Sequence, residues 1–93
     1  MAFITVTKRG TESDYFKERS VNIDYIVSYG MADVYLNDSA QDGEYCEIEL
    51  STGKSIYVEE SVSDIYEMIT LAKNTGEDIS MYEVNRTRKR EEL

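Results

Sequence analysis

Alternating apolar and polar positions predict β-strands over the first two thirds of the chain. In residues 2–8, Ala2, Ile4 and Val6 fall on one face, because successive side chains of a strand point to opposite sides of a sheet. Residues 15–21 predict a second strand more weakly, since three consecutive charged residues interrupt the alternation. The N-terminal segment therefore favours two strands joined by a polar turn.

The middle of the chain continues the strand pattern. Residues 22–29 alternate clearly, with isoleucine, tyrosine, valine and tyrosine on one side. Gly30 is expected to break this strand, because glycine is depleted in strands, and residues 31–36 are expected to resume it. Residues 37–43 are rich in Asn, Asp, Ser and Gly, a composition typical of a loop.

The clearest local signal is a β-hairpin over residues 44–59. A two-residue loop would place Ile48 opposite Tyr57, which pairs an apolar residue with a polar one. A three-residue loop places Ile48 opposite Ile56 and lets Gly53 supply the left-handed residue of a bulged turn. We therefore favour the three-residue loop.

One helix is predicted over residues 61–74. Ser61 and Asp64 have the spacing of a capping box, with Asp in place of the usual Glu. Lys73 in the last turn suits the helix dipole, and Gly76 is a plausible end. The predicted apolar face consists of Val62, Ile65, Tyr66, Ile69 and Ala72, widened by Met68 and Leu71.

These elements predict an α+β fold, a small antiparallel sheet of roughly four to six strands with one helix packed on one face. Residues 77–84 are expected to add a final, irregular strand. The organisation expected from the sequence is a single acidic domain over residues 1–85 and a basic C-terminal tail over residues 86–93.

Composition and charge narrow the function. The 93-residue chain carries 10 Lys and Arg against 19 Asp and Glu, a formal net charge of −9, with no His and a single Cys. Without histidine it lacks a Ser-His-Asp triad and the usual zinc ligands. The acid excess argues against direct nucleic-acid binding, which needs a basic surface. We therefore expect a non-enzymatic protein with no catalytic residues, no metal and no cofactor.

The sign of the charge changes at the C-terminus. Residues 86–93 hold four basic and two acidic residues, which gives +2, whereas residues 1–85 hold six basic and 17 acidic residues, which gives −11. The basic tail could contact nucleic acid or another anionic surface, fold back on the acidic body, or form a solvated terminus.

One side of the predicted hairpin interleaves carboxylates with tyrosines, and we call it the acidic face. Tyrosine offers a large rigid contact area, and carboxylates pair with Arg or Lys of a partner. The competing interpretation is a solvated sheet face, in which tyrosine is simply a good strand former. The candidate partner-binding residues are Tyr45, Glu47, Glu49, Tyr57 and Glu59.

Other candidates for chemistry have simpler explanations. Glu59 and Glu60 are adjacent carboxylates that could serve a small hydrolase or metal-dependent enzyme, but the sequence indicates no cleft around them. Residues 38–43 lack the ligand spacing of a calcium loop. Cys46 lies on the apolar side of the hairpin, so we expect a buried thiol and no nucleophile.

Three segments share the pattern of an apolar strand, a Gly-centred hairpin and a short helix. They are Asn-Ile-Asp-Tyr-Ile over residues 22–26, Ile-Glu-Leu-Ser-Thr-Gly-Lys over 48–54, and Val-Glu-Glu-Ser-Val over 58–62, which leads into the helix up to Ile69. In this pattern, about half of the chain resembles the small FlbD-like family associated with flagellar operons. The resemblance implies a compact sheet with a helix, no known catalytic residues and a role through protein contacts.

Size, charge and the acidic face together favour a protein that binds and modulates or inhibits a basic protein or nucleoprotein complex that handles nucleic acid. A phage-encoded inhibitor of a host defence complex, such as an anti-CRISPR protein, has this size and charge. The alternative is an assembly or regulatory factor of the FlbD-like kind, which acts through its helix or a sheet edge.

The expected location is the cytoplasm of a bacterium or of an infected host cell. No apolar run approaches the ~20 residues that span a bilayer, and no signal peptide is apparent, so we expect no membrane partner. Open sheet edges would allow pairing with a second copy, giving a homodimer, or with a partner strand.

Overall fold

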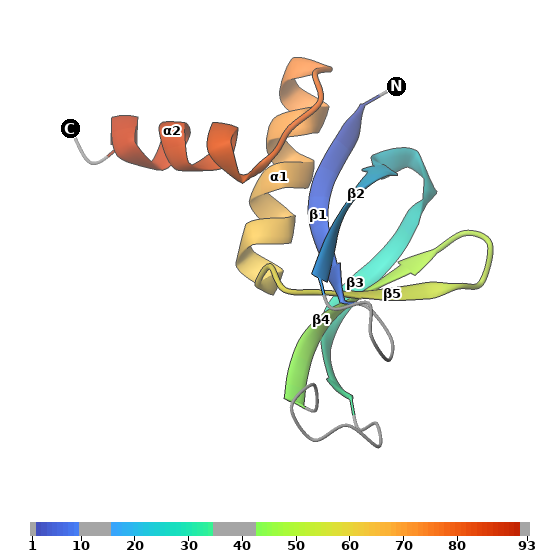
Figure 1. Ribbon diagram of the computed structural model, residues 1–93. Coiled ribbons are helices and arrows are strands. Elements are labelled where there is room, and N and C mark those ends of the chain that lie inside the picture. The colour runs from blue at the N-terminus through green and yellow to red at the C-terminus, as the bar shows by residue number, and fades with distance from the viewer. Residues whose placement is uncertain (1, 10–15, 35–42, 92–93) are drawn as a thin grey trace.

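The protein is an α+β fold with a five-stranded antiparallel sheet and two helices, as the computed structural model shows for residues 2–9, 16–34 and 43–91 (Figure 1). The strand order is β2-β1-β5-β4-β3. This confirms the α+β class. The elements are β1 (Phe3–Arg9), β2 (Phe16–Asn22), the 3-10 turn η1 (Ile23–Tyr25), β3 (Ile26–Val34), β4 (Gly43–Leu50), β5 (Ser55–Val58), α1 (Val62–Thr75) and α2 (Met81–Glu91).

A single apolar core joins the sheet to α1. Figure 1 shows α1 lying alongside β1, with α2 running crosswise to it and away from the sheet. Complete burial of an Ile or Met side chain stabilises a fold by about 1.5–3 kcal/mol, so this layer dominates the packing. The side chains with no exposed surface are Ile4, Val6, Ile48, Val58, Ile65, Met68 and Ala72.

The β4–β5 hairpin has the register of the three-residue loop, as predicted. Ile48 pairs with Ile56, and the backbone N–H of Leu50 donates to the carbonyl of Lys54 at 2.8 Å. Gly53 has φ +88°, the left-handed conformation that the bulged turn requires. Matching apolar residues across the two strands therefore identified the correct turn.

Helix α1 also agrees with its sequence signals. The backbone N–H of Asp64 donates to Ser61 Oγ at 3.0 Å, the N–H of Ser61 donates to the Asp64 carboxylate at 3.3 Å, and Gly76 ends the helix with φ +71°. One assignment to its apolar face was wrong. Tyr66 is 59% exposed, whereas Met68, expected only to widen the face, is fully buried.

The structure corrects the predicted strand over residues 22–29. A 3-10 turn occupies Ile23–Tyr25, where Asn22 Oδ1 accepts a hydrogen bond from the N–H of Asp24 at 2.9 Å. Gly30 was expected to end a strand, yet β3 continues through it and pairs Gly30 with Glu47. Glycine can adopt the extended backbone of a strand, although it stabilises the strand less than a residue with a side chain does. Some of the predicted positions lie outside the described residues: residue 1, Tyr15, the end of the predicted strand at 35–36 and the predicted loop over 37–42.

The final strand expected over residues 77–84 is also corrected. Only Ile79 pairs with the sheet, through a parallel bridge to Ile4, and the chain then enters α2. The backbone N–H of Ser80 donates to the Glu83 carboxylate at 2.8 Å, and Ser80 Oγ accepts from the N–H of Tyr82 at 3.2 Å. The Ser-x-x-Glu spacing is a capping signal that the sequence contains and that alternation alone misses.

In the part of the chain that the structure describes, no helix has both the length and the apolar character needed to cross a membrane. Helix α2 spans the boundary that the sequence suggested between residues 85 and 86, so the basic segment up to residue 91 continues a helix that starts in the acidic body.

The different conformations of two glycines yield a first prediction. Gly53→Ala should lower the free energy of unfolding by about 1 kcal/mol, because an L-residue is strained at φ +88° although its Cβ meets no atom within 4 Å. Gly30→Ala is the matched control and should be neutral or slightly stabilising, because its Cβ also meets open space and its φ is ordinary. Urea unfolding of both variants measures this, and equal losses would contradict the assignment of Gly53.

Candidate partner-binding face

The two sides of the β4–β5 hairpin differ sharply in burial. Cys46, Ile48 and Val58 are at most 1% exposed and belong to the core. Side chains alternate along a strand, so the residues between them lie on the opposite side. The register places Glu47 opposite Tyr57, which agrees with the prediction that carboxylates and tyrosines interleave on this side.

The five candidate residues differ in how far they reach solvent. Glu49 and Glu59 are exposed, whereas Tyr45, Glu47 and Tyr57 are half-buried. Burial raises the pKa of the Tyr57 hydroxyl, and the negative charge of Glu47 and a hydrogen bond with it raise that pKa further. Glu47 and Tyr57 therefore interact with each other, while Glu49 and Glu59 present their charge to solvent.

The acidic face contains a cation that sequence reasoning missed. The Arg9 guanidinium lies 5.0 Å from the centroid of the Tyr45 ring, and Arg9 is only 5% exposed. A cation over an aromatic face is attracted by the ring quadrupole. Arg9 thus holds Tyr45 in place and makes that end of the acidic face less negative than the end at Glu49. The residue is 36 positions away in sequence from Tyr45, so no local pattern could indicate this contact.

The adjacent carboxylates Glu59 and Glu60 have separate environments. The Glu60 carboxylate accepts hydrogen bonds from the Thr7 backbone N–H at 2.8 Å and from Thr7 Oγ1 at 2.7 Å. The N–H of Glu59 donates to the Thr7 carbonyl at 3.0 Å. Glu60 therefore fastens the end of β5 to β1.

The cysteine is placed as the sequence predicts. Cys46 is 1% exposed, and burial raises the pKa of its thiol, an effect that a backbone hydrogen bond with Gly30 only partly opposes. The thiol therefore stays protonated near neutral pH and serves as a core side chain. Across the described ranges, no group of three or more His, Cys, Asp or Glu residues is arranged to hold a metal ion.

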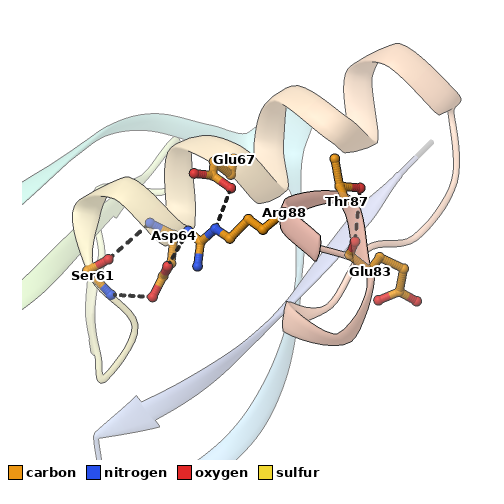
Figure 2. A network of polar contacts seen from close by, with 6 residues as sticks. All are labelled: Ser61, Asp64, Glu67, Glu83, Thr87 and Arg88. Carbon is orange, nitrogen blue, oxygen red and sulfur yellow. Dashed lines mark hydrogen bonds and ion pairs between the residues drawn. The ribbon is translucent and has the colours of Figure 1, made fainter. Parts of the chain in front are cut away.

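Part of the basic segment folds back on the acidic body. Figure 2 shows the Arg88 side chain reaching from α2 to two carboxylates of α1. Arg88 Nη2 lies 2.7 Å from Asp64 Oδ1, and Arg88 Nε lies 2.9 Å from Glu67 Oε2. The other basic side chains of α2 are exposed, with Arg86 stacked on Tyr82. Among the described residues of the basic segment, Arg88 is thus the one that forms ion pairs with the acidic body.

The ion pairs shift the pKa values of both partners. Burial alone would raise the pKa of the Asp64 carboxyl, but hydrogen bonds from Arg88 and Ser61 outweigh it and hold the pKa below its ordinary value. In turn, hydrogen bonds with the carboxylates of Glu67, which has the larger effect, and of Asp64 raise the pKa of Arg88. Asp64 serves twice, since it also closes the capping box of α1, so the helix start and the position of α2 are linked.

Comparison with protein-family models, with curated proteins and with solved structures finds no match for this chain.

The lowered pKa of Asp64 yields a second prediction. The Asp64 carboxylate contributes to stability fully above the unfolded-state pKa of about 3.9, and this contribution is lost as pH falls through the lower native pKa. Arg88→Gln should therefore destabilise the protein at pH 7 and differ less from the wild type in acid, as thermal unfolding measured across pH would show. Lys89→Gln on the same helix is the control and should have little effect throughout. A destabilisation by Arg88→Gln that stays constant down to about pH 2.5 would contradict the role of this pair.

Proposed function

We propose that this chain is a small acidic binding protein that occupies a basic surface of a nucleic-acid-handling protein or nucleoprotein complex and so modulates or inhibits it. Binding of this kind needs no catalytic residue and no cofactor. An inhibitor of a host defence complex encoded by a phage, acting in the cytoplasm of the infected cell, is one such protein. The observation that carries the proposal is the outward-facing carboxylates of the β4–β5 hairpin, backed by a buried apolar side.

The distribution of charge supports the proposal. Residues 1–85 carry −11, and Glu49 and Glu59 are exposed. A field of this sign attracts a basic surface and raises the rate of encounter. Tyr57 and Tyr45 lie beside these carboxylates with part of their rings accessible, which suits the packing of Arg and Lys side chains against aromatic rings.

The mechanism would be occlusion. A rigid strand pair presents Glu47 and Glu49 two residues apart on one side, a separation of about 6–7 Å along a strand. Neighbouring phosphates of a nucleic-acid strand are spaced on a similar scale, so cationic side chains that normally contact phosphates could pair with these carboxylates. Glu49 is also positioned by Ser28, whose Oγ donates to its carboxylate at 3.0 Å.

An assembly or regulatory factor of the FlbD-like kind is the second candidate, and one observation favours it. β3 ends the strand order, and its Val27 and Met31 are 63% and 56% exposed. An edge strand with exposed apolar side chains can accept a partner strand or a second copy of the chain. Such a factor would bind through this edge and would not need the acidic face.

A charge reversal on the acidic face distinguishes the two candidates. The immobilised protein should retain basic nucleic-acid-binding proteins from a heparin-binding fraction of bacterial lysate, and retention should decline with added salt. Glu47→Lys combined with Glu49→Lys should remove most of this retention, because two attractive contacts become repulsive. Mass spectrometry of the retained proteins is the measurement.

The matched control reverses two exposed glutamates elsewhere, Glu18→Lys and Glu77→Lys, with the same change in net charge. It should retain the same proteins at nearly the same yield. If reversal of Glu47 and Glu49 leaves the retained proteins unchanged, the proposal is wrong. Loss of retention by Met31→Asp alone would favour the β3 edge.

A further inference from the structure

A pocket of about 600 Å³ lies between the β1–β2 hairpin and the turn of the β4–β5 hairpin. Its walls come from β1, β2, η1, the end of β4 and the start of β5. This volume is within the range of about 300–1,000 Å³ that is typical of sites for small molecules. The pocket is separate from the acidic face, and its properties do not depend on the function proposed above.

The charge of this pocket is opposite to that of the molecule. Lys8, Arg19 and Lys54 line it, and no acidic residue of the described ranges does, although the chain has 19 Asp and Glu. None of the three cations pairs with a carboxylate in the described ranges. Three cations that line one pocket without an ion pair among the described residues repel one another, so an anion bound among them would be favourable.

The register explains why these cations meet. Arg19 pairs with Val6, which is fully buried, so the Arg19 side chain lies on the same side of the hairpin and is exposed at its rim. Lys8 lies two residues beyond Val6 on that same side. The opposite turn holds the backbone of Lys54, whose carbonyl accepts from the N–H of Leu50 at 2.8 Å, while its side chain is exposed.

The remaining lining is apolar and aromatic. Val21, Leu50 and Ile56 contribute side chains from the inner side of the sheet, and Phe3 and Tyr25 are 36% and 57% exposed at the pocket. The carbonyl of Tyr25 accepts from the N–H of Ser51 at 2.8 Å, which ties η1 to the β4–β5 turn. The pocket lining therefore combines cationic side chains with aromatic rings on which a flat ligand can stack.

We propose that this pocket binds a mononucleotide. Its phosphate would be held by Arg19, Lys54 and Lys8. Three cationic groups balance the charge of a dianionic phosphate better than they balance the single charge of a carboxylate. Its base would stack on Tyr25 or Phe3, as bases do on aromatic side chains of nucleic-acid-binding sites.

The charge of the whole chain selects a free nucleotide over a nucleic-acid strand. A strand that continued out of the pocket would cross a surface of negative potential, because the chain carries −9 overall. A mononucleotide carries its negative charge on one phosphate, which the cationic side chains of the pocket can neutralise. The rest of the molecule then disfavours polyanions without excluding the small ligand.

Isothermal titration calorimetry with AMP tests the proposal, with adenosine, inorganic phosphate and a 5′-phosphorylated single-stranded oligonucleotide as comparison probes. AMP should bind more tightly than each of the other three probes. Only AMP offers both a phosphate for the cations and a base for the aromatic rings without adding negative charge outside the pocket. Arg19→Gln combined with Lys54→Gln should weaken AMP at least about tenfold, the loss expected for charge-assisted hydrogen bonds.

The matched control is Lys89→Gln combined with Arg90→Gln, which removes the same charge from exposed positions on α2 and should leave AMP affinity unchanged. NMR titration of the wild type is a second measurement that needs no variant. AMP should shift the amide signals of residues 19–25 and 50–56 and leave those of residues 81–91 in place.

Four outcomes would overturn the assignment. They are the absence of AMP binding at millimolar concentration, phosphate binding as tightly as AMP, tighter binding of the oligonucleotide, and equal weakening by the α2 control. The second would leave only a simple anion site, the third would indicate the end of a nucleic-acid strand, and the fourth would indicate diffuse electrostatic attraction.

Discussion

Burial of one side of the β4–β5 hairpin in a common core with α1 is the constraint on which the remaining features depend. Cys46, Ile48 and Val58 share that core with Ile65 and five further residues of α1 and β1. A slip of one residue in the hairpin would turn these side chains to water, each at a cost of about 1.5–3 kcal/mol, and would bury glutamates in their place. The outward orientation of the acidic face is therefore a consequence of the core.

Charge is segregated in this molecule. Carboxylates lie on the outer side of the β4–β5 hairpin, whereas Lys8, Arg19 and Lys54, which form no ion pair among the described residues, line the pocket beside the other hairpin. Four of the other seven basic residues lie on α2. Arg88 of α2 pairs with Asp64 and Glu67 of α1, and Arg9 lies beside Tyr45 of the acidic face. Segregation of this kind allows one small domain to present surfaces of both signs, so a basic protein and a small anion could be bound at once.

Local sequence signals predicted the elements whose structure depends on neighbouring residues. The register of the hairpin, the left-handed Gly53 and the capping box of α1 each follow from residues only a few positions apart, because turns and helix caps are closed by short-range hydrogen bonds. The capping signal that starts α2, Ser80 with Glu83, is equally local. Apolar alternation does not indicate this helix, because the segment has no clear apolar face.

The sequence by itself determined that the chain folds as an acidic α+β domain and which side of the hairpin is polar, since side-chain alternation and net charge are properties of the chain. Only the tertiary structure decided that Arg9 covers Tyr45, that Glu60 fastens Thr7, and that Lys8 and Arg19 meet Lys54 around one pocket. Each of these contacts joins residues more than 30 positions apart. Their meeting depends on how β1 pairs with β5 and on how the two hairpins approach, which no local pattern encodes.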